Sequence, residues 1–352
     1  CRAMAESGTL LSVSLAERDT GGDVMCVWSY PVTDAQLESV VLQRGGLLEE
    51  VATTRFVYTY HQNTWLFIYT QVNDKHHEKL PKVTAFSLCL QSKAFDPEKY
   101  SALCQILSLA YATSGNPVRI LEGYLSVFTT GQFEGQGQSF TSSSFDARRA
   151  LLATPLKDVV KIFGVETILI WTALLLKKRV VVYCDRQSEL LRIIRALPTL
   201  VWHRQNWKIL RPFMTVDDES LQELRSAGVY CAGFHDASIQ QHSELYDLFV
   251  DITAETITVA EAAKADFVMT SVHKDVAMQL VNSCEEGNDQ AVIKGLALKT
   301  KELLNKLVSL KTPFEDGRSF ITKESLEEQF PANMARFLYN VALAENHTAE
   351  AS

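Results

Sequence analysis

The most informative hydrophobic pattern lies in the middle of the chain. Residues 165–176 are apolar on nearly all sides of a helix, which predicts a buried helix rather than a surface one. Three cations at 177–179 follow at its C-terminal turn, where the helix dipole favours them. Residues 180–183 form a β-branched and aromatic run, typical of a strand covered on both faces, and residues 187–201 return to helical periodicity. This order of elements predicts the centre of an α/β sheet.

The sequence TALLLKKRVVVY at residues 172–183, followed by Trp207 and Pro212, resembles the central region of the DENN domain. DENN modules occur in proteins that bind Rab GTPases, and many of these proteins are nucleotide exchange factors. In that family the tryptophan at the position of Trp207 is chiefly structural, so we expect it to pack in the core. The resemblance implies an α/β protein with a longin-like, α+β N-terminal lobe and a larger α/β DENN lobe that has a helical C-terminal part.

The N-terminal third has the pattern of an antiparallel sheet accompanied by helices. An alternating run around a Thr-Gly-Gly-Asp turn predicts a hairpin over residues 11–30. Thr33 and Gln36 have the spacing of a capping box, for a helix that ends near Gly45. Three further strands, at 55–60, 65–72 and 83–91, and two helices, at 97–115 and 117–130, are expected after it. The whole order, two strands, a helix, three strands and two helices, resembles the longin-like lobe and supports the DENN assignment independently.

A low-complexity run, GQFEGQGQSFTSSS, separates two regions of regular pattern. Its Gly, Gln and Ser content predicts a flexible linker over residues 131–145. On this basis the N-terminal lobe spans 5–130, the central α/β region spans 146–260, and the helical C-terminal region spans 261–352. The elements expected after the central motif are a helix, a strand and a hairpin, at 217–226, 229–234 and 247–259.

Composition and charge narrow the functional classes. The 352 residues are 47% hydrophobic and 22% charged, which is typical of a globular protein. A net charge of −8 argues against a nucleic-acid partner, because phosphate contacts need clustered Lys and Arg. Seven widely spaced cysteines indicate reduced thiols in a cytoplasmic protein. No apolar run approaches the roughly 20 residues that a bilayer requires, and no signal peptide is visible, so we expect peripheral membrane association at most.

Motifs that would carry catalytic chemistry are absent or incomplete. A His-Glu pair at 77–78 opens like a zinc-protease helix, but Pro81 stands where the second histidine belongs. The glycines at 131–137 are not followed by the Gly-Lys-Ser/Thr of a phosphate loop. Cys231 and His235 could be a thiol–imidazole pair, although a buried cysteine at a strand end is the commoner arrangement. The sequence therefore predicts no catalytic residue, no metal and no cofactor.

Candidates for a GTPase interface gather near one edge of the N-terminal lobe. Tyr30 is a large aromatic residue at a strand exit, before Pro31, and Thr9 leads into the neighbouring strand. Lys75 lies in the polar loop at 73–78. Aromatic and cationic groups at one edge suit a protein interface. The alternative is that Tyr30 is a half-buried sheet residue and that the loop is only solvated.

A second group of candidates is Trp202, His203 and Arg204, where many DENN proteins carry a Pro-containing loop. By resemblance we expect a Rab-binding exchange factor in late endosomal and multivesicular body trafficking. The alternative is a non-catalytic adaptor of an endosomal recycling assembly of the Commander type. A nucleotide-using α/β enzyme is disfavoured, because no strand is followed by the glycine fingerprint.

Overall fold

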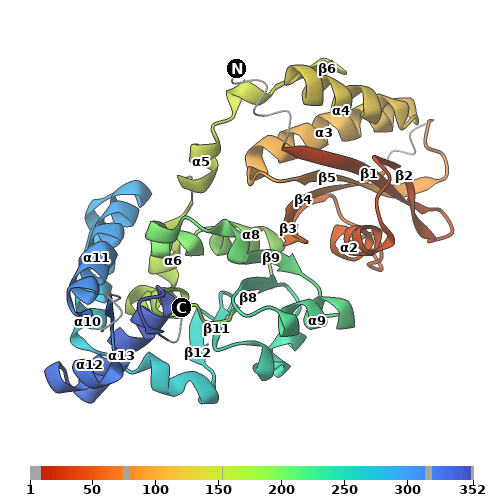
Figure 1. The fold of residues 1–352 in the computed structure, drawn as a ribbon. Coiled ribbons are helices and arrows are strands. Elements are labelled where there is room, and N and C mark those ends of the chain that lie inside the picture. Colours follow the sequence, from red (N-terminus) through yellow and green to blue (C-terminus); the bar gives the residue numbers. More distant parts are fainter. Residues whose placement is uncertain (1–8, 74–78, 153, 314–318, 350–352) are drawn as a thin grey trace. The chain divides into compact units, whose positions relative to one another are not determined.

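The computed structural model describes residues 9–73, 79–152, 154–313 and 319–349 (Figure 1). The chain divides into two compact units, Cys1–Ala153 and Thr154–Ser352. The first unit has an antiparallel sheet and the second a mainly parallel one, so the predicted mixed α/β class with an α+β first lobe is confirmed.

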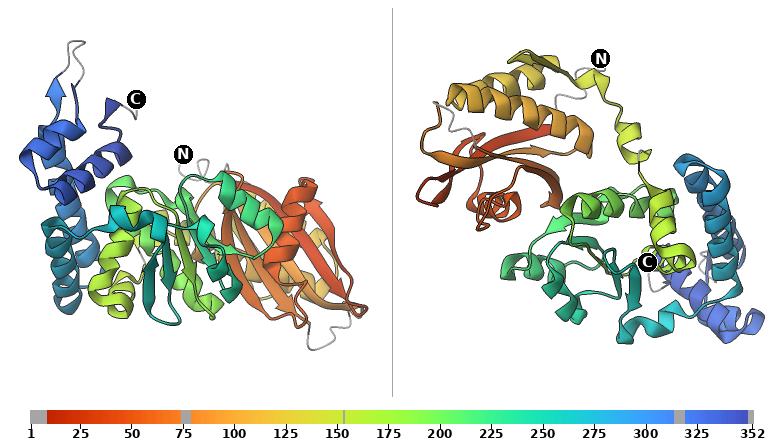
Figure 2. Two further views of the ribbon diagram at one scale, coloured as in Figure 1. Left: turned by 90° about the horizontal axis from the view of Figure 1, so that it is seen from below. Right: turned by 180° about the vertical axis from the view of Figure 1, so that it is seen from behind.

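The first unit is a five-stranded antiparallel sheet between helices (Figures 1 and 2). Its strands are β1 (Leu10–Asp19), β2 (Val24–Tyr30), β3 (Arg55–His61), β4 (Thr64–Val72) and β5 (Val83–Ser92), in the order β2-β1-β5-β4-β3. One face is covered by α2 (Ala35–Gly45), and the other by α3 (Pro97–Ser114) and α4 (Val118–Thr130). These elements follow the predicted order, and β2 is an edge strand.

Aspartate side chains cap the N-termini of α2 and α3, and the cap of α2 differs from the prediction. The Asp96 carboxylate accepts from the Lys99 backbone N–H at 3.1 Å and starts α3. Helix α2 is capped by Asp34, which accepts from the Leu37 N–H at 2.8 Å, and not by Thr33. The Thr33 hydroxyl donates to Glu38 at 3.2 Å instead, because Asp34 already occupies the capping position.

Residues 131–145 form structure where a flexible linker was predicted. Strands β6 (Gln132–Gly135) and β7 (Gln138–Thr141) pair as a short antiparallel hairpin. Phe140 is only 3% exposed and stacks against Phe145, with ring centroids 5.6 Å apart. This burial anchors the hairpin in spite of its Gly- and Ser-rich composition. The first unit continues through α5 (Ala147–Leu152), and the division between the units falls after Ala153 rather than after residue 145.

The second unit contains a five-stranded sheet with the central motif at its core. Its strands are β8 (Val180–Tyr183), β9 (Leu210–Met214), β10 (Cys231–Phe234), β11 (Leu248–Asp251) and β12 (Thr256–Val259), in the order β12-β11-β8-β10-β9. Strand β8 is central and parallel to both of its neighbours, β10 and β11. Val181 is fully buried between Ala232 and Phe249 on these strands, which confirms the prediction of a strand covered on both faces.

Helices surround this sheet and form the C-terminal part of the unit (Figures 1 and 2). The helices of the second unit are α6 (Leu156–Phe163), α7 (Thr167–Leu175), α8 (Gln187–Ile194), α9 (Asp218–Ser226), α10 (Ser271–Glu286), α11 (Asp289–Ser309), α12 (Lys323–Gln329) and α13 (Ala332–Ala344). The described part of residues 261–349 is mainly helical, with one short strand pair, β13 (Thr312–Pro313) and β14 (Ser319–Phe320). Among the described residues, no helix is long and apolar enough to cross a bilayer.

The helix predicted for 187–201 is shorter than expected. Helix α8 ends at Ile194, and a 3₁₀ segment at Leu197–Arg204 follows it. Pro198 explains the change, because it has no N–H to donate to the carbonyl of Ile194 and its ring would collide with that turn. The 3₁₀ segment brings Trp202, His203 and Arg204 to the position described below.

Candidate functional site

Tyr30 ends the edge strand β2 and stands beside helix α4. It is 40% exposed, and its ring meets that of Tyr124 edge-on, with 5.9 Å between centroids. Tyr124 is buried and stacks on Phe128 with 6.1 Å between centroids, and Phe128 is 37% exposed. We call Tyr30, Tyr124 and Phe128 the aromatic rim. Tyr30 is therefore both a half-buried sheet residue and a partly exposed aromatic group.

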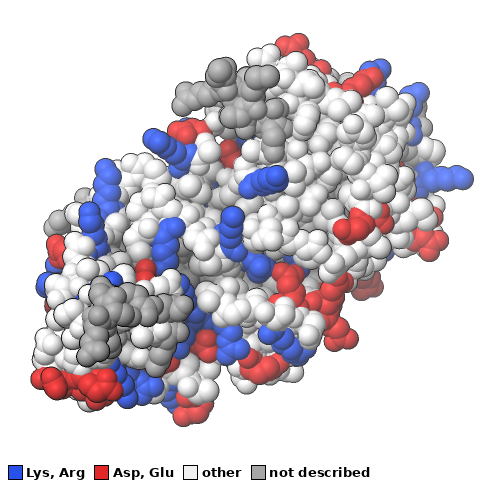
Figure 3. Space-filling model, viewed as in Figure 1, with Lys and Arg blue, Asp and Glu red and all other residues white. Residues whose placement is uncertain are grey.

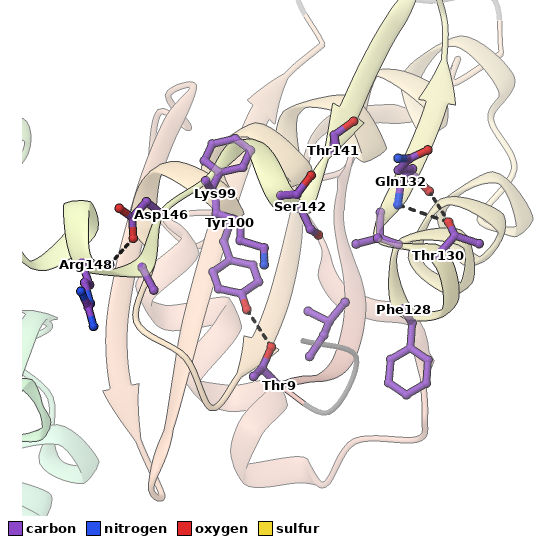
Figure 4. A pocket seen from close by; sticks show the side chains of 16 residues that line it. Thr9, Lys99, Tyr100, Phe128, Thr130, Gln132, Thr141, Ser142, Asp146 and Arg148 are labelled. Carbon is purple, nitrogen blue, oxygen red and sulfur yellow. Dashed lines mark hydrogen bonds between the residues drawn. The ribbon is translucent and has the colours of Figure 1, made fainter. Parts of the chain in front are cut away.

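Thr9 precedes β1 and lines a pocket with a volume of about 750 Å³ in the first unit (Figure 4). The pocket is bounded by the first turn of α3, the last turn of α4 and the segment from β7 to α5. The Thr9 and Tyr100 hydroxyl oxygens are 3.4 Å apart. Phe128 belongs to both the pocket lining and the aromatic rim, so the pocket and the rim adjoin along α4. Lys75, the third candidate, lies outside the described residues.

Trp202, His203 and Arg204 make contacts inside the second unit. The Trp202 ring packs edge-on against Trp207, with 5.8 Å between centroids, and Trp207 is buried as expected. The Nε2 atom of His203 is 3.1 Å from a carboxylate oxygen of Glu345, and the Nε atom of Arg204 donates to the same oxygen at 3.0 Å. The segment therefore ties the end of α13 to the sheet region.

Arg204 also satisfies the end of helix α7. Its guanidinium donates to the carbonyl oxygens of Leu174 and Leu175, at 2.6 and 2.7 Å. Burial alone would raise the pKa of Glu345, but the hydrogen bond from His203 and the charge of Arg204 outweigh it and hold that pKa at about 2. These contacts give the second group of candidates a structural role, and any role in binding remains a prediction.

The second sheet places Cys231 away from reactive chemistry. Cys231 lies in β10 between Val180 and Leu210 and is fully buried, and burial raises the pKa of its thiol well above the ordinary value. The His235 ring packs against Phe213, with 5.5 Å between centroids. Within the described ranges, no group of three or more His, Cys, Asp or Glu side chains is arranged to hold a metal ion.

Charge does not gather on the face of the molecule that Figure 3 displays. Basic and acidic side chains are interspersed there, with no large area of a single sign. An extended phosphate backbone requires a continuous basic area, and this face does not provide one.

The sequence reasoning missed Tyr124 and Phe128. Both lie in the predicted helix, and their i, i+4 spacing places the rings on one helix face, which is the available signal. An apolar helix face is usually core, so this signal alone could not show that Phe128 is partly exposed. Nothing local links these residues to Tyr30 either, because the contact depends on α4 packing over the edge of the sheet.

Comparison with known proteins agrees with this architecture. The family model described as "SPA: Stabilization of polarity axis" matches residues 153–261, which contain the second sheet. DENN domain-containing protein 10 of Dictyostelium discoideum is 46% identical over 353 residues, covering 95% of this chain and 96% of the relative. The chain belongs to the DENN domain-containing protein 10 family. Family members from Danio rerio and Homo sapiens are 40% and 39% identical, over 97% of this chain and 99% and 97% of their own lengths. Because these matches cover nearly the whole chain, the family assignment applies to both units.

Proposed function

We propose that this chain is a Rab GTPase-binding guanine nucleotide exchange factor that acts in late endosomal and multivesicular body trafficking. Two lines support the proposal. The first is membership of the DENN domain-containing protein 10 family, with matches that span both units. The second, which carries the site, is the aromatic rim, where Tyr30 and Phe128 are partly exposed above the buried Tyr124.

The reaction needs a binding surface and no acid, base or nucleophile from the exchange factor. When a GTPase binds GDP with a dissociation constant near 1 pM, the binding free energy of the complex is about −16 kcal/mol. An exchange factor opposes this by binding the nucleotide-free conformation more tightly than the loaded one. Displacement of the segments that enclose the nucleotide requires shape complementarity, and the Mg²⁺ involved belongs to the GTPase.

The aromatic rim has the features of an interface anchor. Large aromatic side chains that are held rigidly lose little conformational entropy on binding, and they dominate interface energetics. Tyr30 and Phe128 are held in this way, because each packs against the buried ring of Tyr124. Leu125, which is 37% exposed on the same helix, adds apolar area. We propose that the GTPase contacts this rim, together with Thr9 and Lys75.

The alternative, an adaptor in a Commander-type assembly, has no specific support. The relatives are named for the DENN domain and not for such an assembly. A protein of that kind would bind a GTPase, if at all, without favouring its nucleotide-free form.

Release of fluorescently labelled GDP from a panel of Rab proteins tests the proposal. With this protein in excess, we expect accelerated release from at least one Rab. A matched pair of variants then tests the site: Tyr30→Ala with Phe128→Ala should remove the acceleration, whereas Leu48→Ala with Val51→Ala should retain it. Leu48 and Val51 are also exposed apolar residues of the first unit, at 59% and 72%, but they lie outside the rim. Unchanged release across the panel would contradict the exchange function, and equal effects of both variants would contradict the site.

A further inference from the structure

The pocket beside the aromatic rim has a lining suited to a polar ligand (Figure 4). Its volume of about 750 Å³ is within the range of small-molecule sites. Apolar side chains, among them Val127 and Phe128, form part of the wall. The rest is rich in hydroxyl and amide groups, from Thr9, Thr130, Gln132, Thr141, Ser142 and Ser143. A lining of this kind can donate to and accept from several ligand hydroxyls at once.

Ser142 contributes a side-chain hydroxyl to the lining of the pocket. Its backbone N–H donates to the Gly131 carbonyl at 2.7 Å, which fixes the residue at the base of the β6–β7 hairpin. The residue is 5% exposed, yet its hydroxyl has no hydrogen-bond partner in the described part of the chain. The Oγ atom does not belong to the buried side-chain atoms that lack a partner, so it is accessible at the pocket wall rather than enclosed. The Ser142 hydroxyl is therefore available to a group that enters the pocket.

Two cationic residues belong to the lining of the same pocket. Lys99 lies in the first turn of α3, with its Nζ atom 5.8 Å from the centroid of the Tyr100 ring, and Arg148 lies in α5. Neither side chain forms an ion pair with any other residue that the structure describes. The acid of the lining is Asp146, whose carboxylate accepts from the Arg148 backbone N–H at 2.9 Å. Two cations and one carboxylate leave one positive charge in excess, in a chain whose net charge is −8.

We propose that this pocket binds a phosphorylated polyol, with its phosphate groups on Lys99 and Arg148 and its hydroxyls on the Ser142 side of the lining. Cationic side chains recognise phosphate through charge-assisted hydrogen bonds, and a hydroxyl-rich wall complements a sugar-like or inositol-like ring. The ligand can come from a soluble phosphorylated polyol or from the headgroup of a lipid. The pocket shares Thr9 and Phe128 with the proposed GTPase contact, but binding of a small ligand is measured without a GTPase, so it can fail or succeed independently of the exchange activity.

Calorimetric titration of the full chain with inositol 1,4,5-trisphosphate tests the proposal, with unphosphorylated myo-inositol as the reference ligand. We expect saturable binding of the trisphosphate, and binding of myo-inositol at least tenfold weaker. Lys99→Ala combined with Arg148→Ala should weaken trisphosphate binding by about a hundredfold, since hydrogen bonds to charged groups are among the stronger ones. Ser142→Ala should weaken it less, by about threefold to tenfold, because it removes one hydrogen bond to a neutral ligand hydroxyl.

The matched control is Lys93→Ala combined with Arg149→Ala, which removes the same charge from exposed residues of the first unit that lie outside the lining. This control should bind like the wild type, and thermal melting should show that all variants fold. No trisphosphate binding, or an equal loss in the control, would overturn the proposal. Vesicles with and without a phosphorylated inositol lipid then identify the source: recruitment that soluble trisphosphate competes away supports a lipid headgroup, and binding of the soluble form alone supports a free ligand.

Discussion

Replacing Arg204 with methionine tests whether the segment at 202–204 holds the second unit together. Methionine keeps the apolar stem but removes the donor to Leu174, Leu175 and Glu345, and the Glu345 side chain is only 18% exposed. Breaking a buried pair costs about 3–5 kcal/mol, because one charge is left buried without its partner. His203 still contacts Glu345, so the low end applies. The expected loss in free energy of unfolding is about 3 kcal/mol.

The assay is urea denaturation together with hydrogen exchange, read on peptides from α13, because the two units need not unfold as one. Arg225→Met is the matched control, since the Arg225–Glu244 pair of the same unit spans 3.5 Å with side chains 45% and 55% exposed. Removing an exposed pair of this kind should cost less than about 1 kcal/mol. If Arg204→Met exchanges and unfolds like the wild type, the structural role is refuted, and the segment becomes the stronger candidate for an interface.

Three further predictions concern the rim, the pH dependence and the core. Tyr30→Ala with Phe128→Ala should weaken binding of nucleotide-free Rab by about 2 kcal/mol, or roughly thirtyfold, with little change in melting temperature; loss of folding instead would show that the rim is a support. Burial lowers the pKa of His273 from 6.5 to about 4. The unfolded chain therefore takes up this proton at higher pH, and stability present above pH 6.5 should be lost as the pH falls toward 4; a His273→Gln variant should lack this component. Val181→Asp in the central strand should lower the free energy of unfolding by several kcal/mol, because it buries an unpaired charge. Thr258→Asp on the edge strand of the same sheet should leave it nearly unchanged. A soluble Val181→Asp variant with an unchanged melting temperature would contradict the core assignment.

The sequence predicted the helices and strands that are determined by neighbouring residues in the chain. The β-branched run at 180–183 became the central strand, because such a run is typical of a strand buried on both faces. Asp96 and Gly115 mark the ends of α3, because a capping carboxylate and a left-handed glycine act within one turn. The sequence did not predict the hairpin at 131–145, because the hairpin is stabilised by burial of Phe140. Composition does not show that this side chain packs against Phe145.

The candidate site was predictable only in part, for the same reason. Tyr30 could be proposed from its place at a strand exit, but its neighbours Tyr124 and Phe128 depend on how α4 packs on the sheet. The partnership of Arg204 with Glu345 joins the middle of the chain to its C-terminal helix, and no local pattern connects them. The pocket is formed by the ends of several elements, so its lining has no motif in the sequence.

The most direct measurement of the central claim compares two affinities of one Rab. Binding of this protein to the nucleotide-free and to the GDP-loaded form is measured by biolayer interferometry under the same conditions. Exchange by differential binding predicts an affinity for the nucleotide-free form at least about a hundredfold higher, or roughly 2.7 kcal/mol. Equal affinities for the two forms would contradict the account, because a ligand that binds both states equally cannot shift the equilibrium between them.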